Sequence, residues 1–132
     1  MKILIVDDDK TTRKLLSLYL KEGSFSVITA ENGLDAMEKL GSETIQLVMT
    51  DLNMPFMDGI EFIKTMKSNH RTAHIPALML TAETDGEEKE RAFKAGADGY
   101  LSKPVTAEEV IAKIKRMLED VSKKGEKPYA KA

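Results

Sequence analysis

The stretch LVMTDLNMP, residues 47–55, gives the clearest indication of how this chain folds. Its apolar run is too short for a free-standing helix and ends at one carboxylate, Asp51, which a turn-favouring Asn and a Pro follow. The pattern predicts a buried strand that delivers Asp51 to the rim of a sheet, where an open α/β sheet places its chemistry. An Asp after a strand is more often a helix cap or a loop residue, so the ends of the other strands decide its role.

Four further segments have the character of strands. Residues 2–6, a lysine followed by four apolar residues, are typical of a central parallel strand that is covered on both faces. Largely apolar segments at residues 25–30 and 75–80 and a short one at residues 99–102 complete the set. Pro76 is tolerable near the start of its strand.

Five segments with helical spacing of apolar residues alternate with these strands. They are residues 10–22, a stretch from Leu34 to Leu40 that Gly41 ends, a stripe from Ile60 to Met66, residues 86–95 and a last helix after Thr106. Strands that alternate with helices predict an α/β protein with a doubly wound, five-stranded parallel sheet.

The composition is that of one folded domain. The 132 residues are 42% hydrophobic and 32% charged, which suits a globular chain rather than a disordered one. The net charge of −2 gives no electrostatic case for direct binding to nucleic acid or to an anionic membrane. The chain has no cysteine, which excludes disulfides and thiolate metal sites. It also lacks an apolar run long enough to span a membrane and a secretory signal, so a cytoplasmic protein is expected.

Charged and polar side chains stand at the predicted carboxyl ends of the strands. They are Asp7, Asp8 and Asp9 after the first strand, Asp51 after the third, Thr81 after the fourth and Lys103 after the fifth. These ends lie on one edge of a parallel sheet, so the side chains are expected to converge, except that Asp9 is expected to cap the next helix. Clustered carboxylates disfavour one another's ionisation, so such a cluster favours a bound cation.

This set of side chains suits phosphoryl transfer. Carboxylates, together with a backbone carbonyl and waters, suit Mg²⁺, which leaves room for phosphate oxygens. Asp51 can act as the nucleophile that forms an aspartyl phosphate. Lys103 can pair with the phosphoryl group and the Thr81 hydroxyl can donate to one of its oxygens, which supplies positioning and charge neutralisation.

The same residues resemble the receiver domain of two-component response regulators, in particular a chemotaxis-type single-domain regulator. The motifs that carry the resemblance are the pair Asp7-Asp8, the run DLNMPFMDG at residues 51–59, Thr81-Ala82 and Lys103-Pro104, in this order. The resemblance covers residues 1 to about 121 and implies the flavodoxin-like strand order 2-1-3-4-5. It also implies a cis peptide bond between Lys103 and Pro104.

The resemblance implies a metal site and a phosphoacceptor. Asp51 would accept a phosphoryl group from a histidine kinase or a phosphotransfer protein. Asp8 and Asp51 would be direct Mg²⁺ ligands, the main-chain carbonyl of Asn53 a third, and Asp7 would act through water. Thr81 and Lys103 would contact the phosphoryl group.

The resemblance further implies a conformational switch that a downstream protein target senses. Tyr100 stands where the family keeps an aromatic side chain that swings inward when Thr81 moves toward the phosphate. The phosphate would bias an existing two-state surface made of the fourth helix, fifth strand and fifth helix. Glu83 can tune dephosphorylation, although surface charge is the more usual role for such a residue.

Three alternatives compete with a phosphoacceptor signalling domain that catalyses its own phosphorylation and dephosphorylation. An aspartate-nucleophile phosphohydrolase, a true enzyme, carries a second Asp two residues after its nucleophile, where this chain has Asn53. A flavodoxin-like cofactor binder needs a phosphate loop after the first strand, where three aspartates would repel the phosphate. A phosphorylation-independent scaffold of the same fold does not require the complete set of side chains for phosphoryl transfer, which this chain has.

The last residues differ from the rest of the chain. After Val121 the apolar periodicity is lost and Gly125 and Pro128 appear among several lysines, so we expect a receiver domain at residues 1–121 and a basic tail or linker at residues 122–132. The sequence favours a stand-alone regulator, a monomer or weak dimer, over the start of a linker to an output domain. The kinase, the target and the phosphoryl lifetime stay open.

Overall fold

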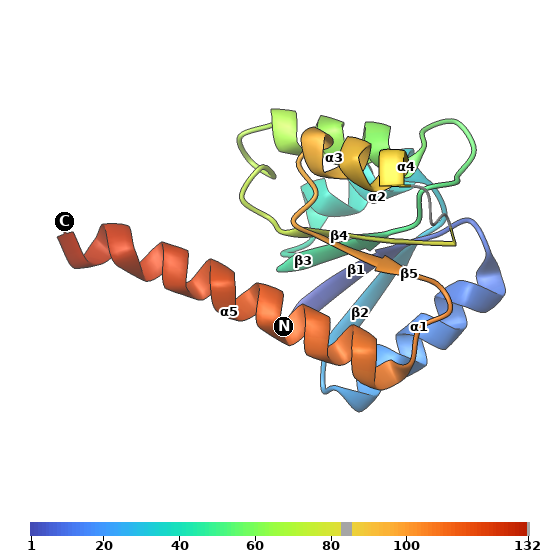
Figure 1. Ribbon diagram of the computed structural model, residues 1–132, viewed down its shortest axis with the longest axis horizontal. Coiled ribbons are helices and arrows are strands. Elements are labelled where there is room, and N and C mark those ends of the chain that lie inside the picture. The colour runs from blue at the N-terminus through green and yellow to red at the C-terminus, as the bar shows by residue number, and fades with distance from the viewer. Residues whose placement is uncertain (83–85, 132) are drawn as a thin grey trace.

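Five parallel strands form one sheet at the centre of the computed structural model, which describes residues 1–82 and 86–131, with side chains up to residue 121 (Figure 1). The strands are β1 (Lys2–Val6), β2 (Ser26–Ala30), β3 (Leu47–Thr50), β4 (Ala77–Thr81) and β5 (Gly99–Ser102). Their order is β2-β1-β3-β4-β5, so the predicted fold class and strand order are confirmed. This order places β3, the strand that precedes Asp51, in the middle of the sheet.

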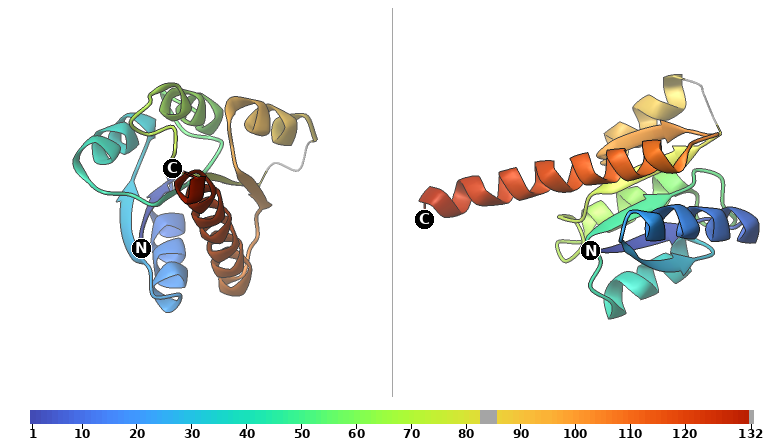
Figure 2. Two further views of the ribbon diagram at one scale, coloured as in Figure 1. Left: turned by 90° about the vertical axis from the view of Figure 1, so that its left-hand side faces the viewer. Right: turned by 90° about the horizontal axis from the view of Figure 1, so that it is seen from below.

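Helices cover both faces of the sheet. They are α1 (Lys10–Glu22), α2 (Gly33–Ser42), α3 (Gly59–Ser68), α4 (Gly86–Ala95) and α5 (Ala107–Lys131). Figures 1 and 2 show α2, α3 and α4 on one face and α1 and α5 on the other. Right-handed crossovers between parallel strands produce this arrangement when the strand order reverses next to the first strand.

The core has two layers because successive side chains of a strand point to opposite faces. Ile3, Ile5 and Met49 pack toward α1 and α5, whereas Leu4 and Val48 pack toward α2, α3 and α4. Every residue of β3 and β4 is buried. These central strands are apolar up to their last residues, Thr50 and Thr81, as expected for a sheet covered on both sides.

Several predicted element boundaries are wrong. Strand β2 begins at Ser26 rather than at residue 25, and β4 ends at Thr81 rather than at residue 80. Helix α2 passes through Gly41, because the Glu43 N–H still donates to the Lys39 carbonyl, and Leu34 is 60% exposed rather than part of the buried stripe. Packing of the rest of the helix offsets the weak helix propensity of one glycine. Strand β4 begins at Ala77, since Pro76 has no N–H to pair with a neighbouring strand.

Helix α5 continues beyond Val121, through residues that the sequence predicts as a tail or linker, to Lys131. It projects beyond the body of the domain (Figure 1). Once packed turns have nucleated a helix, each further residue adds a hydrogen bond, and the Lys, Glu and Ala of this segment are good helix formers. The end of the receiver domain at residue 121 stays a prediction.

Candidate functional site

Backbone hydrogen bonds continue the sheet one residue past the strands and thereby align the site. The Asp51 N–H donates to the Val6 carbonyl at 2.9 Å, and the Asp7 N–H donates to the Ala30 carbonyl at 3.1 Å. The Lys103 N–H donates to the carbonyl of Thr81 at 2.8 Å. Side chains from segments nearly a hundred residues apart therefore leave the same edge of the sheet, as the sequence predicts.

Three carboxylates meet at this edge. Asp7, Asp8 and Asp51 each offer an oxygen, and these oxygens lie within 4.8 Å of one another. Asp7 is buried, with 2% of its surface exposed, whereas Asp51 is half-buried and Asp8 is exposed. An all-oxygen donor set that is open to solvent on one side fits a hard divalent cation that keeps waters or phosphate oxygens.

Lys103 lies between two of these carboxylates. Its Nζ is 3.2 Å from Asp7 Oδ2 and 3.5 Å from Asp51 Oδ1. The other oxygen of Asp7, Oδ1, accepts the Asp9 N–H at 2.9 Å. Both oxygens of Asp7 thus have partners within the chain, which leaves Asp8 and Asp51 as the more accessible carboxylates.

The protonation of Asp51 is shifted by its surroundings. Burial raises the pKa of the carboxyl above its usual 3.8, and the negative charge of Asp7 adds to this rise. The Lys103 ammonium opposes the shift without cancelling it. Asp51 is therefore a more basic carboxylate than an exposed aspartate, which favours a nucleophilic role.

The backbone of Asp51 is fixed by its neighbours. The Thr50 hydroxyl donates to the Asp51 carbonyl at 3.0 Å, and the Gly59 N–H donates to the Leu52 carbonyl at 2.7 Å. A Cβ on Gly59 would collide with the Asp51 carbonyl oxygen. Only a glycine lets the start of α3 approach this close, so the loop between β3 and α3 folds back beside Asp51.

The remaining predicted residues surround the cluster. Asn53 lies exposed in the loop after β3, Thr81 is fully buried at the end of β4, and Tyr100 is half-buried in β5. The peptide bond between Lys103 and Pro104 is cis, as the resemblance implies. Glu83 lies outside the described residues.

Helix caps account for two further acidic residues near the site. Asp9 accepts the Thr12 N–H at the start of α1, which confirms its predicted role as a cap. This bond and the one from the Thr12 hydroxyl lower the pKa of the Asp9 carboxyl. Asp58 caps α3 in the same way.

Two contacts of the site are not predictable from the sequence motifs alone. Arg13 Nη1 donates to the Asp7 carbonyl at 2.7 Å and so ties α1 to the acidic edge. The Lys89 Nζ lies 6.0 Å from the centre of the Tyr100 ring and so links α4 to β5. Helix spacing could have indicated Arg13, which lies one turn after the cap Asp9, whereas the contact of Lys89 depends on how α4 packs.

The chain is similar in sequence to known proteins. Residues 3–115 match the family described as the response regulator receiver domain. The chain belongs to this family. It is 37% identical to the chemotaxis protein CheY of Pseudomonas aeruginosa over 123 residues, which are 92% of this chain and 99% of that protein. It is 38% identical to CheY-3 of Vibrio cholerae over 120 residues, 90% of this chain and 92% of that protein.

Solved receiver structures share the fold. The chemotaxis protein CheY4 of Vibrio cholerae superposes with a TM-score of 0.84 at 34% identity, over 88% of this chain and 97% of that one. A CheY-like receiver domain of Methanospirillum hungatei gives a TM-score of 0.87 at 28% identity, over 93% and 97% of the two chains.

Membership of this family confirms the predicted class of function, phosphoacceptor signalling by a response regulator of the chemotaxis type. These matches give no support to a phosphohydrolase or to a scaffold that works without phosphorylation. Among the described helices, none has the length and apolar character needed to cross a bilayer.

Proposed function

We propose that Asp51 of this receiver domain accepts a phosphoryl group from the phosphohistidine of a histidine kinase or a phosphotransfer protein. The observation that carries the proposal is the convergence of Asp7, Asp8, Asp51 and Lys103 at the carboxyl edge of the sheet. A cytoplasmic location goes with this role and stays a prediction.

The donor set suits Mg²⁺ as the cofactor. Asp8 and Asp51 would bind the ion directly, the main-chain carbonyl of Asn53 would be a third ligand, and Asp7 would act through water. The indirect role of Asp7 is supported by its bonds to Lys103 and to the Asp9 N–H, which occupy both of its oxygens. When bound, the cation would neutralise negative charge on the transferred group.

Three side chains of the chain have different roles in the transfer step. An Asp51 oxygen attacks phosphorus, and the bond between phosphorus and the donor nitrogen breaks, with its electron pair returning to the imidazole. The Lys103 ammonium exchanges a carboxylate partner for a phosphoryl oxygen, and the buried Thr81 hydroxyl donates to another oxygen. Such transfer depends mainly on positioning and electrostatic stabilisation, which these residues supply; the chain would thereby catalyse its own phosphorylation and dephosphorylation.

A groove beside the phosphoacceptor offers a docking place for the phosphodonor. It has a volume of about 300 Å³, lies between α1 and the loop after β5, and Lys103 forms part of its wall. Leu15, which is 46% exposed, lines it together with Pro104 and Val105. An apolar groove that reaches Lys103 would let a donor helix bring its phosphohistidine to Asp51.

The signal would leave through α4, β5 and α5 toward a downstream protein. Helix α4 buries only Ala92 among its residues, so little apolar contact holds it in one position. Thr81 ends the strand that pairs with β5, and the register places Tyr100 beside Met79 in β4. Movement of Thr81 toward the phosphate can therefore reach Tyr100 through one pair of adjacent strands. We expect a monomer or weak dimer.

The test is intact mass after incubation with Mg²⁺ and either acetyl phosphate or beryllofluoride, for the wild-type chain and for Asp51→Asn. Acetyl phosphate should give a Mg²⁺-dependent adduct of one phosphoryl group that is labile to hydroxylamine, and beryllofluoride should add the mass of one BeF₃ group. Both adducts should be lost in the variant. Failure of both reagents, with no Mg²⁺ binding, would instead support the scaffold alternative.

Asp8→Ala tests the metal site separately. Removal of one carboxylate should abolish Mg²⁺ binding and yet raise the melting temperature of the metal-free protein, because it relieves repulsion from Asp7 and Asp51. Calorimetric titration and thermal melts measure the two effects. A clear fall in the melting temperature would contradict the repulsion.

A further inference from the structure

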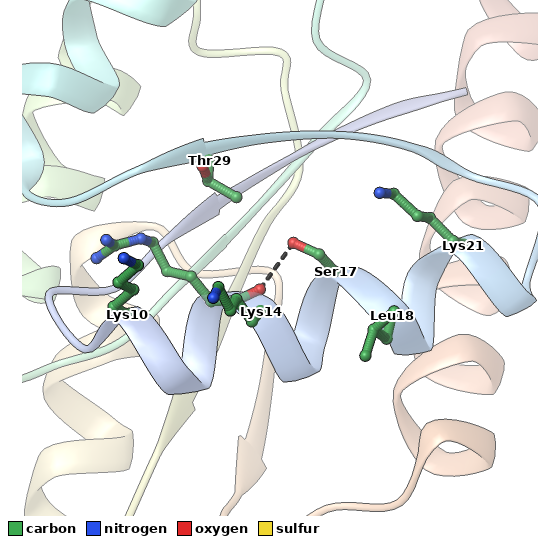
Figure 3. Close-up of a pocket in the computed structure, with 7 residues that line it drawn as sticks. Lys10, Lys14, Ser17, Leu18, Lys21 and Thr29 are labelled. Atoms are coloured by element: carbon green, nitrogen blue, oxygen red, sulfur yellow. Dashed lines mark hydrogen bonds between the residues drawn. The ribbon is translucent and has the colours of Figure 1, made fainter.

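Helix α1 carries a groove on the side that faces the edge strand β2, away from the phosphodonor groove (Figure 3). Its volume is about 470 Å³. The lining side chains are Lys10, Arg13, Lys14, Ser17, Leu18 and Lys21 from α1 and Thr29 from β2. Figure 3 shows Lys10 at one end and Lys21 at the other, with Ser17 between them and Thr29 across the groove.

Four of these seven side chains are cations, in a chain with a net charge of −2. In the described part of the chain, no ion pair within 4.0 Å involves Lys10, Arg13, Lys14 or Lys21. Arg13 instead donates to the Asp7 carbonyl, and the three lysines are exposed. The groove therefore holds positive charge that the described ion pairs do not balance.

Three of these cations, Lys10, Arg13 and Lys14, lie near the start of α1, where they oppose the helix dipole, whereas Lys21 in the last turn and the cap Asp9 suit it. The N-terminus of a helix carries partial positive charge and favours acidic residues in its first turn. Helix α1 has none there and begins instead with Lys10, and Arg13 and Lys14 follow in the next turn. A local arrangement that opposes the helix dipole indicates a role outside the stability of the free chain.

We propose that this groove binds an acidic segment of a partner protein. Lys10 and Lys21 are eleven residues apart, so the helix separates their positions by about 16 Å, the length of roughly five extended residues. Leu18, 61% exposed, lies between the two lysines, three residues before Lys21, and offers an apolar contact toward the Lys21 end of such a segment. The preferred ligand is thus a short stretch with carboxylates at both ends and an apolar residue between them.

Other anionic surfaces fit the groove less well. A helix that lies on a membrane inserts a broad apolar face, whereas the apolar face of α1, with Leu16 and Leu20, is buried in the core. Nucleic-acid binding is favoured by a basic overall charge, which this chain does not have. The inference goes beyond the proposed function, because the groove uses neither Asp51 nor the surface of α4.

The test measures fluorescence anisotropy of a short, dye-labelled peptide made of glutamate and aspartate with one leucine between them. A neutral peptide with glutamine and asparagine in their place is the control ligand. The variant Lys10→Gln/Lys14→Gln/Lys21→Gln should bind the acidic peptide at least tenfold more weakly, a loss of about 1.4 kcal/mol or more. The matched variant Lys64→Gln/Lys94→Gln/Lys115→Gln has the same net charge and should change binding less than about twofold.

Several outcomes would overturn the proposal. Equal losses in the two triple variants would mean that only overall charge attracts the peptide. Absence of peptide binding, with or without groove-dependent binding of polyphosphate, RNA or anionic vesicles, would exclude an acidic protein segment. Asp51→Asn should bind the peptide as the wild-type chain does, so failure of the phosphoacceptor assignment would leave this result unchanged.

Discussion

Burial raises the pKa of the Asp51 carboxyl, and this shift gives the stability of the domain a pH dependence. Since the folded pKa lies above the ordinary 3.8, the folded chain binds this proton more tightly than the unfolded chain does. The stability that results is present below the ordinary pKa and is lost as the pH rises through the folded pKa. At neutral pH the ionised carboxylate therefore destabilises the metal-free fold.

Asp51→Asn should remove this destabilisation of the metal-free fold at neutral pH. In metal-free buffer, the variant is expected to melt above the wild-type chain at neutral pH, with a smaller difference at about pH 3.5, where wild-type Asp51 is largely protonated. Thermal melts followed by circular dichroism across this range measure the difference. If the difference in melting temperature between the variant and the wild-type chain grew as the pH fell, the raised pKa of Asp51 would be contradicted.

Phe56 combines two unfavourable features in the loop after β3. Its φ of 70° lies in the left-handed region, and its side chain is 87% exposed. An asparagine adopts this backbone conformation more easily than a bulky residue does. Phe56→Asn should raise the free energy of unfolding by about 0.5–1 kcal/mol, measured by denaturant titration.

Phe56→Leu is the matched control, because it keeps an exposed apolar side chain at the same backbone conformation. Its stability should stay near that of the wild-type chain. An equal gain in both variants would show that relief of backbone strain is not the cause.

Alanine substitutions at two glycines test where close packing requires the absence of a side chain. At Gly59 an added methyl group would collide with the Asp51 carbonyl, whereas at Gly41, inside α2, it would meet open space. Gly59→Ala should lower the free energy of unfolding by about 2 kcal/mol and slow phosphorylation by acetyl phosphate. Gly41→Ala should raise the free energy of unfolding by about 0.5–1 kcal/mol, because alanine favours a helix interior.

Denaturant titration and the mass assay compare the two glycine variants directly. Gly41→Ala is expected to keep the wild-type phosphorylation rate, since an added methyl group there would meet no other atom within 4 Å. A Gly59→Ala chain with unchanged stability and rate would mean that the loop after β3 shifts freely without disturbing the site.

At the scale of the whole molecule, the phosphoacceptor and α4 are connected through the sheet. The last residues of β4 and β5 pair directly, and α4 enters between these two strands in the chain. Beryllofluoride with Mg²⁺ should therefore change hydrogen exchange in residues 86–95 and 99–102, while strand β2 at the far edge changes little.

Mass spectrometry of peptic fragments resolves these segments. Asp51→Asn, treated in the same way, should show no such change in α4 and β5. Unchanged exchange in α4 of the wild-type chain would contradict a switch on this surface, even if the adduct at Asp51 forms.

Local patterns in the sequence determine much of this protein. Apolar strands, each followed by a polar or charged residue, give the class of fold and place Asp7, Asp51, Thr81 and Lys103 on one edge, because parallel strands share their carboxyl end. The cap Asp9 is equally local, since its side chain bonds to a backbone N–H three residues later. The assignment of roles within the metal and phosphoryl site came from the resemblance to receiver domains.

Other features depend on how distant segments pack against one another. The partners of Asp7, the direction of the pKa shift of Asp51 and the approach of Gly59 depend on distances between segments that no spacing in the chain encodes. Helix α2 passes through Gly41 because packing outweighs the propensity of one residue. The cationic groove of α1 likewise becomes visible once β2 lies beside the helix, since neither element alone forms its walls.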